Sequence, residues 1–190
     1  MLNWLCIFLV IFISHQINAT DYEIIGDDSC FFTRCSKEDN KGNVDIMTIL
    51  DVSNLKHEYS DDLETVRTNG KIMVKGNMPK NVPIRVELEL LRWQHGQWVE
   101  TSISIRRNDF CKSVFDPTEI WYDYMNNLAK NDRDCPPKKG KAYLLKNVLN
   151  RVIVKNVPMA AFPGQYKAIM HLISGNFSTC ISSRMHLNRK

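Results

Sequence analysis

The middle of the chain alternates strictly between apolar and other residues, which restricts it to an extended conformation. Within Val82–Leu90 every second residue is aliphatic, with proline, arginine and glutamate between them. A period of two is typical of a strand with one buried face. A second alternating run, Val99–Ile105, follows a turn-compatible His95-Gly96 pair. The two runs predict a β-hairpin. Pro83 lacks a backbone N–H and is expected at a sheet edge or at the beginning of its strand.

Weaker alternation marks further segments and extends the β prediction along the chain. Together with the hairpin they predict about seven strands separated by turns, which favours a mainly β protein, either a β-sandwich or an open β-cup. Glycine and proline are scattered, with no linker, repeat or low-complexity tract. A single domain is therefore expected. The weaker segments are Ile46–Val52, Ile72–Val74, Tyr143–Val154, Tyr166–Ile173 and Thr179–Leu187.

One segment departs from this pattern and predicts a helix. Asp116-Pro117-Thr118-Glu119 combines an aspartate N-cap, a proline at the first helical position and a glutamate three residues after the cap. Apolar residues then recur at helical spacing, so one short inserted helix is expected at about residues 117–130. Cys111 and Cys135 flank this insertion. A bridge between them would pin both ends and contribute about 3 kcal/mol on the chain-entropy model.

The N-terminus carries the pattern of an export signal. The apolar run Trp4–Ile13 is much shorter than the roughly 20 residues that span a bilayer as a helix. A polar stretch that ends in Ala19 follows it, as in a secretory signal peptide. We therefore interpret residues 1–19 as a signal that is removed, rather than as a buried helix or a membrane anchor. Residues 20–190 are expected to form one secreted domain that is not transmembrane.

Export makes disulfides the default state of the remaining cysteines. Removal of the signal takes Cys6 with it and leaves five, an odd number, so one thiol would be capped, free or joined to a second copy in a dimer. Export also makes Asn176-Phe177-Ser178 a usable sequon, which predicts N-glycosylation at Asn176 on a surface turn. The five are Cys30, Cys35, Cys111, Cys135 and Cys180.

The charge distribution is uneven but does not indicate a nucleic-acid partner. Residues 20–70 hold twelve acidic against five basic side chains, and residues 71–190 hold nine against twenty. No aromatic–basic motif of an RNA- or DNA-binding module accompanies the basic part. The uneven charge is better explained by strands of the acidic third pairing with strands of the basic remainder.

The sequence contains no recognisable catalytic or metal-binding motif. Nucleophile-elbow, His-Glu-x-x-His and Walker patterns are absent. Cys30 and Cys35 are too widely spaced for a Cys-x2-Cys zinc site. His171 alternates with apolar neighbours and is expected to be a partly buried strand residue. We therefore expect a protein that is not an enzyme and that needs no cofactor and no metal.

Several short motifs occur in a characteristic order. Phe110-Cys111, Cys135-Pro136, Val157-Pro158 and Phe162-Pro163-Gly164-Gln165-Tyr166 follow one another around the predicted helix. Together they resemble the insect CheB chemosensory family, which is similar to the ganglioside activator and other ML-type lipid-recognition proteins. The resemblance implies a β-cup around an apolar cavity that takes up a lipid or a cuticular hydrocarbon. It also implies secretion near taste sensory cells, a part in gustatory pheromone detection and a receptor or channel partner in the sensory membrane.

The resemblance also implies disulfide pairs: Cys111 with Cys135, and Cys180 with either Cys30 or Cys35. The predicted helix and the loop after Pro158 are rich in methionine and aromatic side chains, which suit a flexible alkyl ligand. The same side chains would also serve simply to pack the helix onto a sheet. A rival interpretation is a secreted protein ligand or receptor co-factor whose core is filled by its own side chains. The candidate lining residues are Trp121, Tyr124, Met125, Leu128, Met159 and Phe162.

Overall fold

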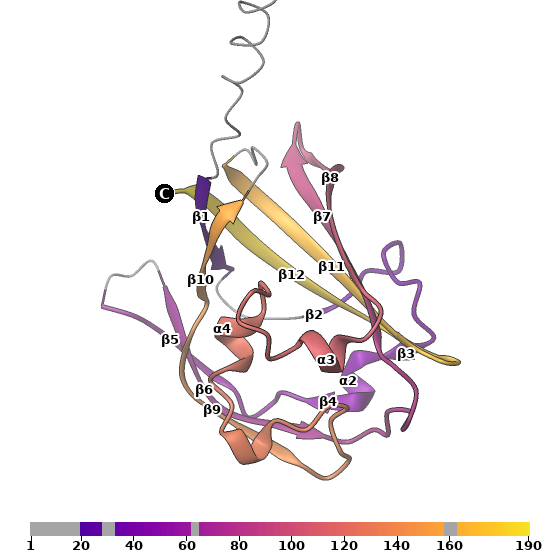
Figure 1. Cartoon of the computed structure of the whole chain (residues 1–190). Helices are drawn as coiled ribbons and strands as arrows, with labels where there is room; N and C mark the ends of the chain where they lie inside the picture. The colour runs from indigo at the N-terminus through magenta and orange to yellow at the C-terminus, as the bar shows by residue number, and fades with distance from the viewer. Residues whose placement is uncertain (1–19, 28–32, 62–64, 158–162) are drawn as a thin grey trace, which may run out of the picture.

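The computed structural model describes residues 20–27, 33–61, 65–157 and 163–190 (Figure 1). Cys30, Met159 and Phe162 therefore lie outside the described residues, as does the predicted signal peptide. The described part is mainly β, with two sheets and a few short helices, as the alternating patterns predict.

The larger sheet contains eight strands, and all its pairings except that of β3 with β12 are antiparallel. Six strands follow one another across it, and the short strands β2 (Thr33–Arg34) and β3 (Val44–Asp45) pair with β12. The six, in spatial order, are β10 (Arg151–Val157), β1 (Thr20–Gly26), β12 (Phe177–Arg189), β11 (Gly164–Ser174), β7 (Arg85–Gln94) and β8 (Gln97–Arg107).

The smaller sheet is built around β6 (Val66–Val74), which pairs with each of its other three strands. These are β4 (Leu50–Asp51), β5 (Lys56–Tyr59) and β9 (Ala142–Leu149). Figure 1 shows this sheet below the larger one, with short helices between them. The helices are α2 (Ile46–Ile49), α3 (Phe110–Ser113), α4 (Tyr122–Met125) and the 3-10 turn η1 (Lys130–Asp132).

The predicted hairpin is confirmed as β7 and β8. Its two-residue turn places both His95 (φ 49°) and Gly96 (φ 82°) in the left-handed region. A turn with two positive φ angles matches the right-handed twist of antiparallel strands, and glycine adopts it without strain. Pro83 precedes β7, which begins at Arg85, so its missing N–H removes no hydrogen bond within the strand.

Two weaker strand predictions need correction. The segment Ile46–Val52 is not one strand, because the Asp45 side chain accepts a hydrogen bond from Met47 N (2.9 Å) and caps helix α2 ahead of β4. The segment Tyr143–Val154 is not one strand either. It divides at Asn150 into β9 of the smaller sheet and β10 of the larger sheet.

Asn150 joins the two sheets at this division. Only 4% of the residue is exposed. Its Oδ1 accepts from Val66 N (2.8 Å), and its own N donates to Val66 O (3.0 Å), which ties it to β6. Its Nδ2 donates to Gly26 O, and Gly26 N donates to Asn150 O (2.7 Å), which ties it to β1. An amide side chain supplies both the donor and the acceptor that this corner needs.

Replacement of Asn150 by alanine should therefore destabilise the whole domain. Asn150→Ala leaves the Val66 N–H and the Gly26 carbonyl without their side-chain partner at a buried corner, a loss of about 3 kcal/mol. Urea unfolding followed by circular dichroism measures it. The exposed strand residue Asn188 is the control, and Asn188→Ala should cost less than about 0.5 kcal/mol. Equal costs for the two variants would contradict the joining role.

The segment between β2 and β3, residues 35–43, lies against the outer face of the larger sheet, the face turned away from the helices. The disulfide Cys35–Cys180 attaches this segment to β12 and closes a separation of 145 residues. Cys35, rather than Cys30, is therefore the partner of Cys180. Lys167 and Asp39 form an ion pair (2.8 Å) with side chains only 12% and 14% exposed. Because both charges are largely removed from water, loss of either partner would leave the other as an uncompensated buried charge.

His171 lies on the same face of β11 and is 5% exposed. Its pKa is lowered, chiefly because burial disfavours the imidazolium and then because of the charge of Lys41, while Glu89, Glu87 and Asp39 act in the opposite direction. The residue is thus a buried strand histidine, as its alternation with apolar neighbours predicts.

The lowered pKa of His171 predicts loss of stability in mild acid. Below about pH 6.5 the unfolded chain takes up a proton that the folded imidazole resists, so protonation favours unfolding. The free energy of unfolding should therefore fall as the pH drops below that value, and His171→Leu should flatten this part of the curve. Urea unfolding at closely spaced pH values measures the slope. An unchanged slope in the variant would contradict the prediction.

Candidate functional site

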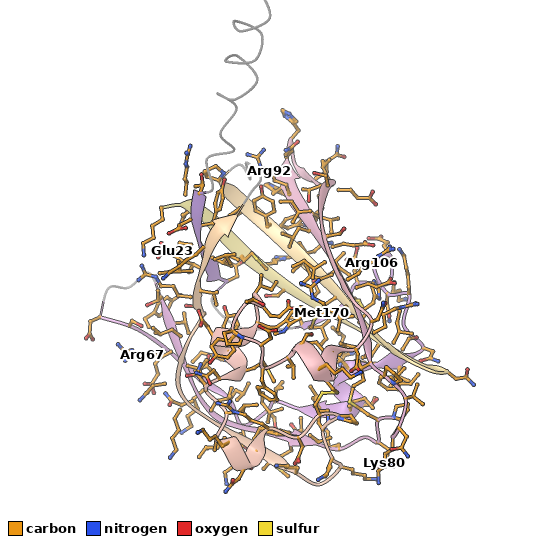
Figure 2. All side chains as sticks on the ribbon, viewed as in Figure 1. Glu23, Arg67, Lys80, Arg92, Arg106 and Met170 are labelled. Atoms are coloured by element: carbon orange, nitrogen blue, oxygen red, sulfur yellow. A yellow bond between two sulfur atoms is a disulfide. The ribbon has the colours of Figure 1, made fainter. Side chains whose placement is uncertain are left out.

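The inner face of the larger sheet carries two separate apolar clusters. The first packs the sheet against the insertion, and the second lies among β1, β11 and β12. Figure 2 shows side chains filling the space between the sheets, with Met170 of β11 among them. The buried members of the first are Ile84, Val86, Val114, Trp121 and Leu172, and those of the second are Tyr22, Tyr166 and Leu187.

A pocket of about 110 Å³ lies beside the first cluster. Five parts of the chain converge on it: helix α2 with β4, the segment between β6 and β7, the inner face of the larger sheet, the insertion, and the segment after η1. All but one of the lining side chains are apolar. The lining consists of Ile46, Ile49, Leu50, Met78, Ile84, Phe110, Val114, Phe115, Met125, Asp134, Cys135, Pro137, Leu172 and Ile181.

The insertion is held together by contacts within itself. The disulfide Cys111–Cys135 closes it, as the resemblance implies. Phe110 and Trp121 pack edge to face with ring centroids 5.1 Å apart, a favoured arrangement of aromatic rings. The indole N–H of Trp121 donates to Ser113 O (3.3 Å). Trp121 therefore holds the insertion together from within.

The predicted helix at 117–130 is much shorter than expected. Only Tyr122–Met125 is α-helical, and turns occupy most of the rest. The Asp116 carboxylate accepts from Thr118 N (2.9 Å) and from the Thr118 hydroxyl (2.7 Å), and so forms a local turn. Glu119 does not complete a capping box, because both of its carboxylate oxygens bond to the Arg107 guanidinium of β8. A tertiary ion pair thus replaces the local cap.

The structure brings one of the predicted lining residues into the pocket wall. Met125 lines it. Trp121 packs in the adjacent cluster. Tyr124 and Leu128 are half-buried outside the lining, and burial followed by the Asp123 charge raises the pKa of Tyr124. Met159 and Phe162 fall outside the described residues.

Sequence reasoning missed most of the wall. Leu172 and Ile181 were expected only as members of alternating strands, and the strand register is what places both on the inner face. Phe115 lies directly before the predicted helix, and Met78 lies outside any expected element. The alternation of β11 was the one sequence signal for a wall residue, since it places Leu172 on the opposite face of the strand from His171.

The one charged group of the lining is neutralised by its neighbours. Asp134 pairs with Lys138 (3.3 Å) and with Lys141. Hydrogen bonds from Lys141 and then Lys138 hold the pKa of Asp134 below its usual value, and the Asp134 bond raises the pKa of Lys141. The pocket therefore offers apolar contact rather than a free charge, which suits apolar ligands.

Among the residues that the structure describes, no three His, Cys, Asp or Glu side chains gather where they could hold a metal ion. Within the same residues no helix has the length and apolar character to cross a membrane. Asn176 is exposed in the turn between β11 and β12, and its glycosylation stays a prediction.

Comparison with known proteins adds no assignment: neither a protein-family model nor a curated protein matches the chain.

The Arg107–Glu119 pair should stabilise the insertion measurably. The Glu119 side chain is 9% exposed, so Arg107→Ala leaves a nearly buried carboxylate without its partner and should cost about 2 kcal/mol. Adding Glu119→Gln to that variant should restore part of the loss, because the unpaired charge is then gone. Urea unfolding measures both variants.

The control is the exposed ion pair of Lys112 with Asp109, in which the lysine side chain is 85% exposed. Lys112→Ala should cost less than about 0.5 kcal/mol. If Arg107→Ala also lowered the free energy of unfolding by less than about 0.5 kcal/mol, the stabilising role of the Arg107–Glu119 pair would be contradicted.

Proposed function

We propose that this protein is a secreted, non-enzymatic binder of lipid or hydrocarbon ligands. The observation that carries the proposal is the pocket between the two sheets, whose lining is apolar except for an ion-paired carboxylate. Apolar clefts with few polar groups are the usual form of sites for such ligands. Burial of each ligand methylene there would contribute about 0.8 kcal/mol.

The size of the pocket restricts how such a ligand would enter. At about 110 Å³ it is smaller than the roughly 150 Å³ cavity that is known to hold benzene. We therefore propose that it receives the end of an alkyl chain. Met78 and Met125 lie in its wall, and methionine side chains adapt to irregular apolar shapes at low cost. Longer segments of the alkyl chain would enter if the Met78 and Met125 side chains and the insertion moved aside.

The proposed setting is extracellular chemoreception. The N-terminal signal pattern supports export, and the two disulfides of the fold are compatible with an extracellular protein. The CheB-like motifs support a part in gustatory pheromone detection, in which the protein would present a cuticular hydrocarbon to a receptor or channel of the sensory membrane.

The rival function, a secreted protein ligand or receptor co-factor, also has an observation in its favour. In the part of the chain that the structure describes, the protein's own side chains pack in two clusters, and the pocket beside the first cluster is small. Such a protein would act through its surface and would take up no ligand.

A substitution that fills the pocket distinguishes the lipid-binding function from the rival function. Leu172→Phe places a ring in the pocket, and it should abolish both the binding of N-phenyl-1-naphthylamine and its displacement by long-chain n-alkanes. Fluorescence titration of the secreted protein measures both. Leu187→Phe is the matched control, because Leu187 is 7% exposed against 8% for Leu172 and belongs to the second cluster. It should keep the binding of the unmodified protein.

Solvent extraction and mass spectrometry of the purified protein provide a second measurement. Co-purifying lipid that Leu172→Phe removes would support the carrier function. A protein without lipid that leaves the fluorescent probe unbound, yet still binds sensory-cell membranes, would favour the rival function. Equal probe binding by Leu172→Phe and the unmodified protein would contradict the proposed pocket.

A further inference from the structure

A second cavity lies on the opposite, outer face of the larger sheet, near the tip of the β7–β8 hairpin. Its volume is about 240 Å³, and it is open to solvent. Unlike the apolar pocket, it is lined by aromatic, charged and amide side chains together. Its lining consists of Asp27, Trp93, Trp98, Gln165 and Arg184, together with Tyr166 and Met185, which alternate with Gln165 and Arg184 along their strands and also pack in the second cluster of the inner face.

Two tryptophans form its aromatic wall. Trp93 and Trp98 are cross-strand partners and meet edge to face with centroids 5.0 Å apart. The face of Trp98 is covered by cations, with Lys167 Nζ 5.5 Å and Arg184 Cζ 6.0 Å from its ring centroid. Trp93 remains 42% exposed. A large apolar ring in this position offers a planar surface for a ligand to stack on.

Hydrogen-bond donors and acceptors surround the two tryptophans. Gln165, Arg184 and Asp27 are all exposed and line the cavity. An amide can both donate and accept, a guanidinium only donates and a carboxylate only accepts. Asp27 is positioned by its backbone, because its N–H donates to Arg184 O (2.9 Å). The polar groups therefore converge beside the tryptophans.

This combination excludes other simple ligand classes. The lining carries one positive and one negative side chain, Arg184 and Asp27, so it offers no surplus of charge to a ligand of either sign. A purely apolar ligand would contact the tryptophans but would make no use of the hydrogen-bonding groups beside them. A sugar ring fits, since its C–H face stacks on an aromatic ring while its hydroxyls both donate and accept. The cavity is larger than the roughly 150 Å³ cavity that is known to hold benzene, which leaves room for a six-membered ring with hydroxyls.

We propose that this cavity binds a pyranose ring of a glycan, stacked on Trp93 and hydrogen-bonded by Gln165, Arg184 and Asp27. It lies on the other side of the sheet from the apolar pocket, so the proposal is independent of lipid binding. The protein would thus recognise a glycan on one face whatever its inner pocket holds.

A glycan array followed by titration tests the proposal. The full secreted chain should retain at least one class of glycan, and the methyl glycoside of the recognised sugar should give saturation-transfer NMR signals and quench tryptophan fluorescence. Trp93→Ala should weaken binding by about tenfold or more, the effect of losing a stacking ring. Gln165→Ala should weaken it by about fivefold, the effect of losing one hydrogen bond.

Two control variants should bind the sugar like the unmodified protein. Leu144→Ala removes a side chain with nearly the same exposure as Trp93, 41%, from the smaller sheet. Arg106→Ala removes an exposed arginine of β8 that is outside the cavity lining (Figure 2). Leu172→Phe, which fills the apolar pocket, should also leave sugar binding unchanged, so failure here and failure of the lipid proposal are distinguishable.

The proposal is overturned if the array retains no glycan and free methyl hexosides at millimolar concentration give no saturation transfer. It is also overturned if Trp93→Ala and Gln165→Ala both bind as the unmodified protein does. Should Trp93→Ala fail to fold, Gln165→Ala decides, because Gln165 is exposed and its removal leaves the hairpin intact.

Discussion

The bonding of Asn150 is the interaction on which the rest of this structure depends. One buried residue bonds to Val66 of the smaller sheet and to Gly26 of the larger sheet at the point where the chain passes from one to the other. Both the relative position of the sheets and the space between them follow from this corner. A buried polar group with satisfied hydrogen bonds specifies one arrangement, because any other would leave buried N–H and C=O groups unpaired.

Strand β11 shows how one element serves two environments. Its inward residues, such as Leu172, face the insertion and the apolar pocket, while Lys167 and His171 alternate with them and meet Asp39 on the outer face. The period of two in a strand makes this separation automatic. The two cavities described above accordingly differ in chemistry: the inner one is apolar, and the outer one combines tryptophan with charged and amide groups.

The accuracy of sequence reasoning varied with the range of the interactions involved. The hairpin at His95-Gly96 was predictable because its turn and its alternation are local. The helix expected at 117–130 was too long because Glu119, which the local pattern assigned to a cap, bonds to Arg107 on a neighbouring strand. Met125 was expected in the lining because the insertion is rich in methionine and aromatic side chains, and it lies in the pocket wall. Phe115 and Met78 were not, because no local period marks residues that converge from separate segments.

The sequence by itself determined the mainly β character, the hairpin and the insertion between two cysteines, since each is set by residue spacing and local backbone preference. It left the partner of Cys180 open between two cysteines, and the fold decided for Cys35. Only the tertiary structure divided Tyr143–Val154 at Asn150, set the register that brings Leu172 and Ile181 together and placed Gln165 beside Trp93. These features depend on contacts between residues far apart in the chain, and one sequence carries no periodic signal for such contacts.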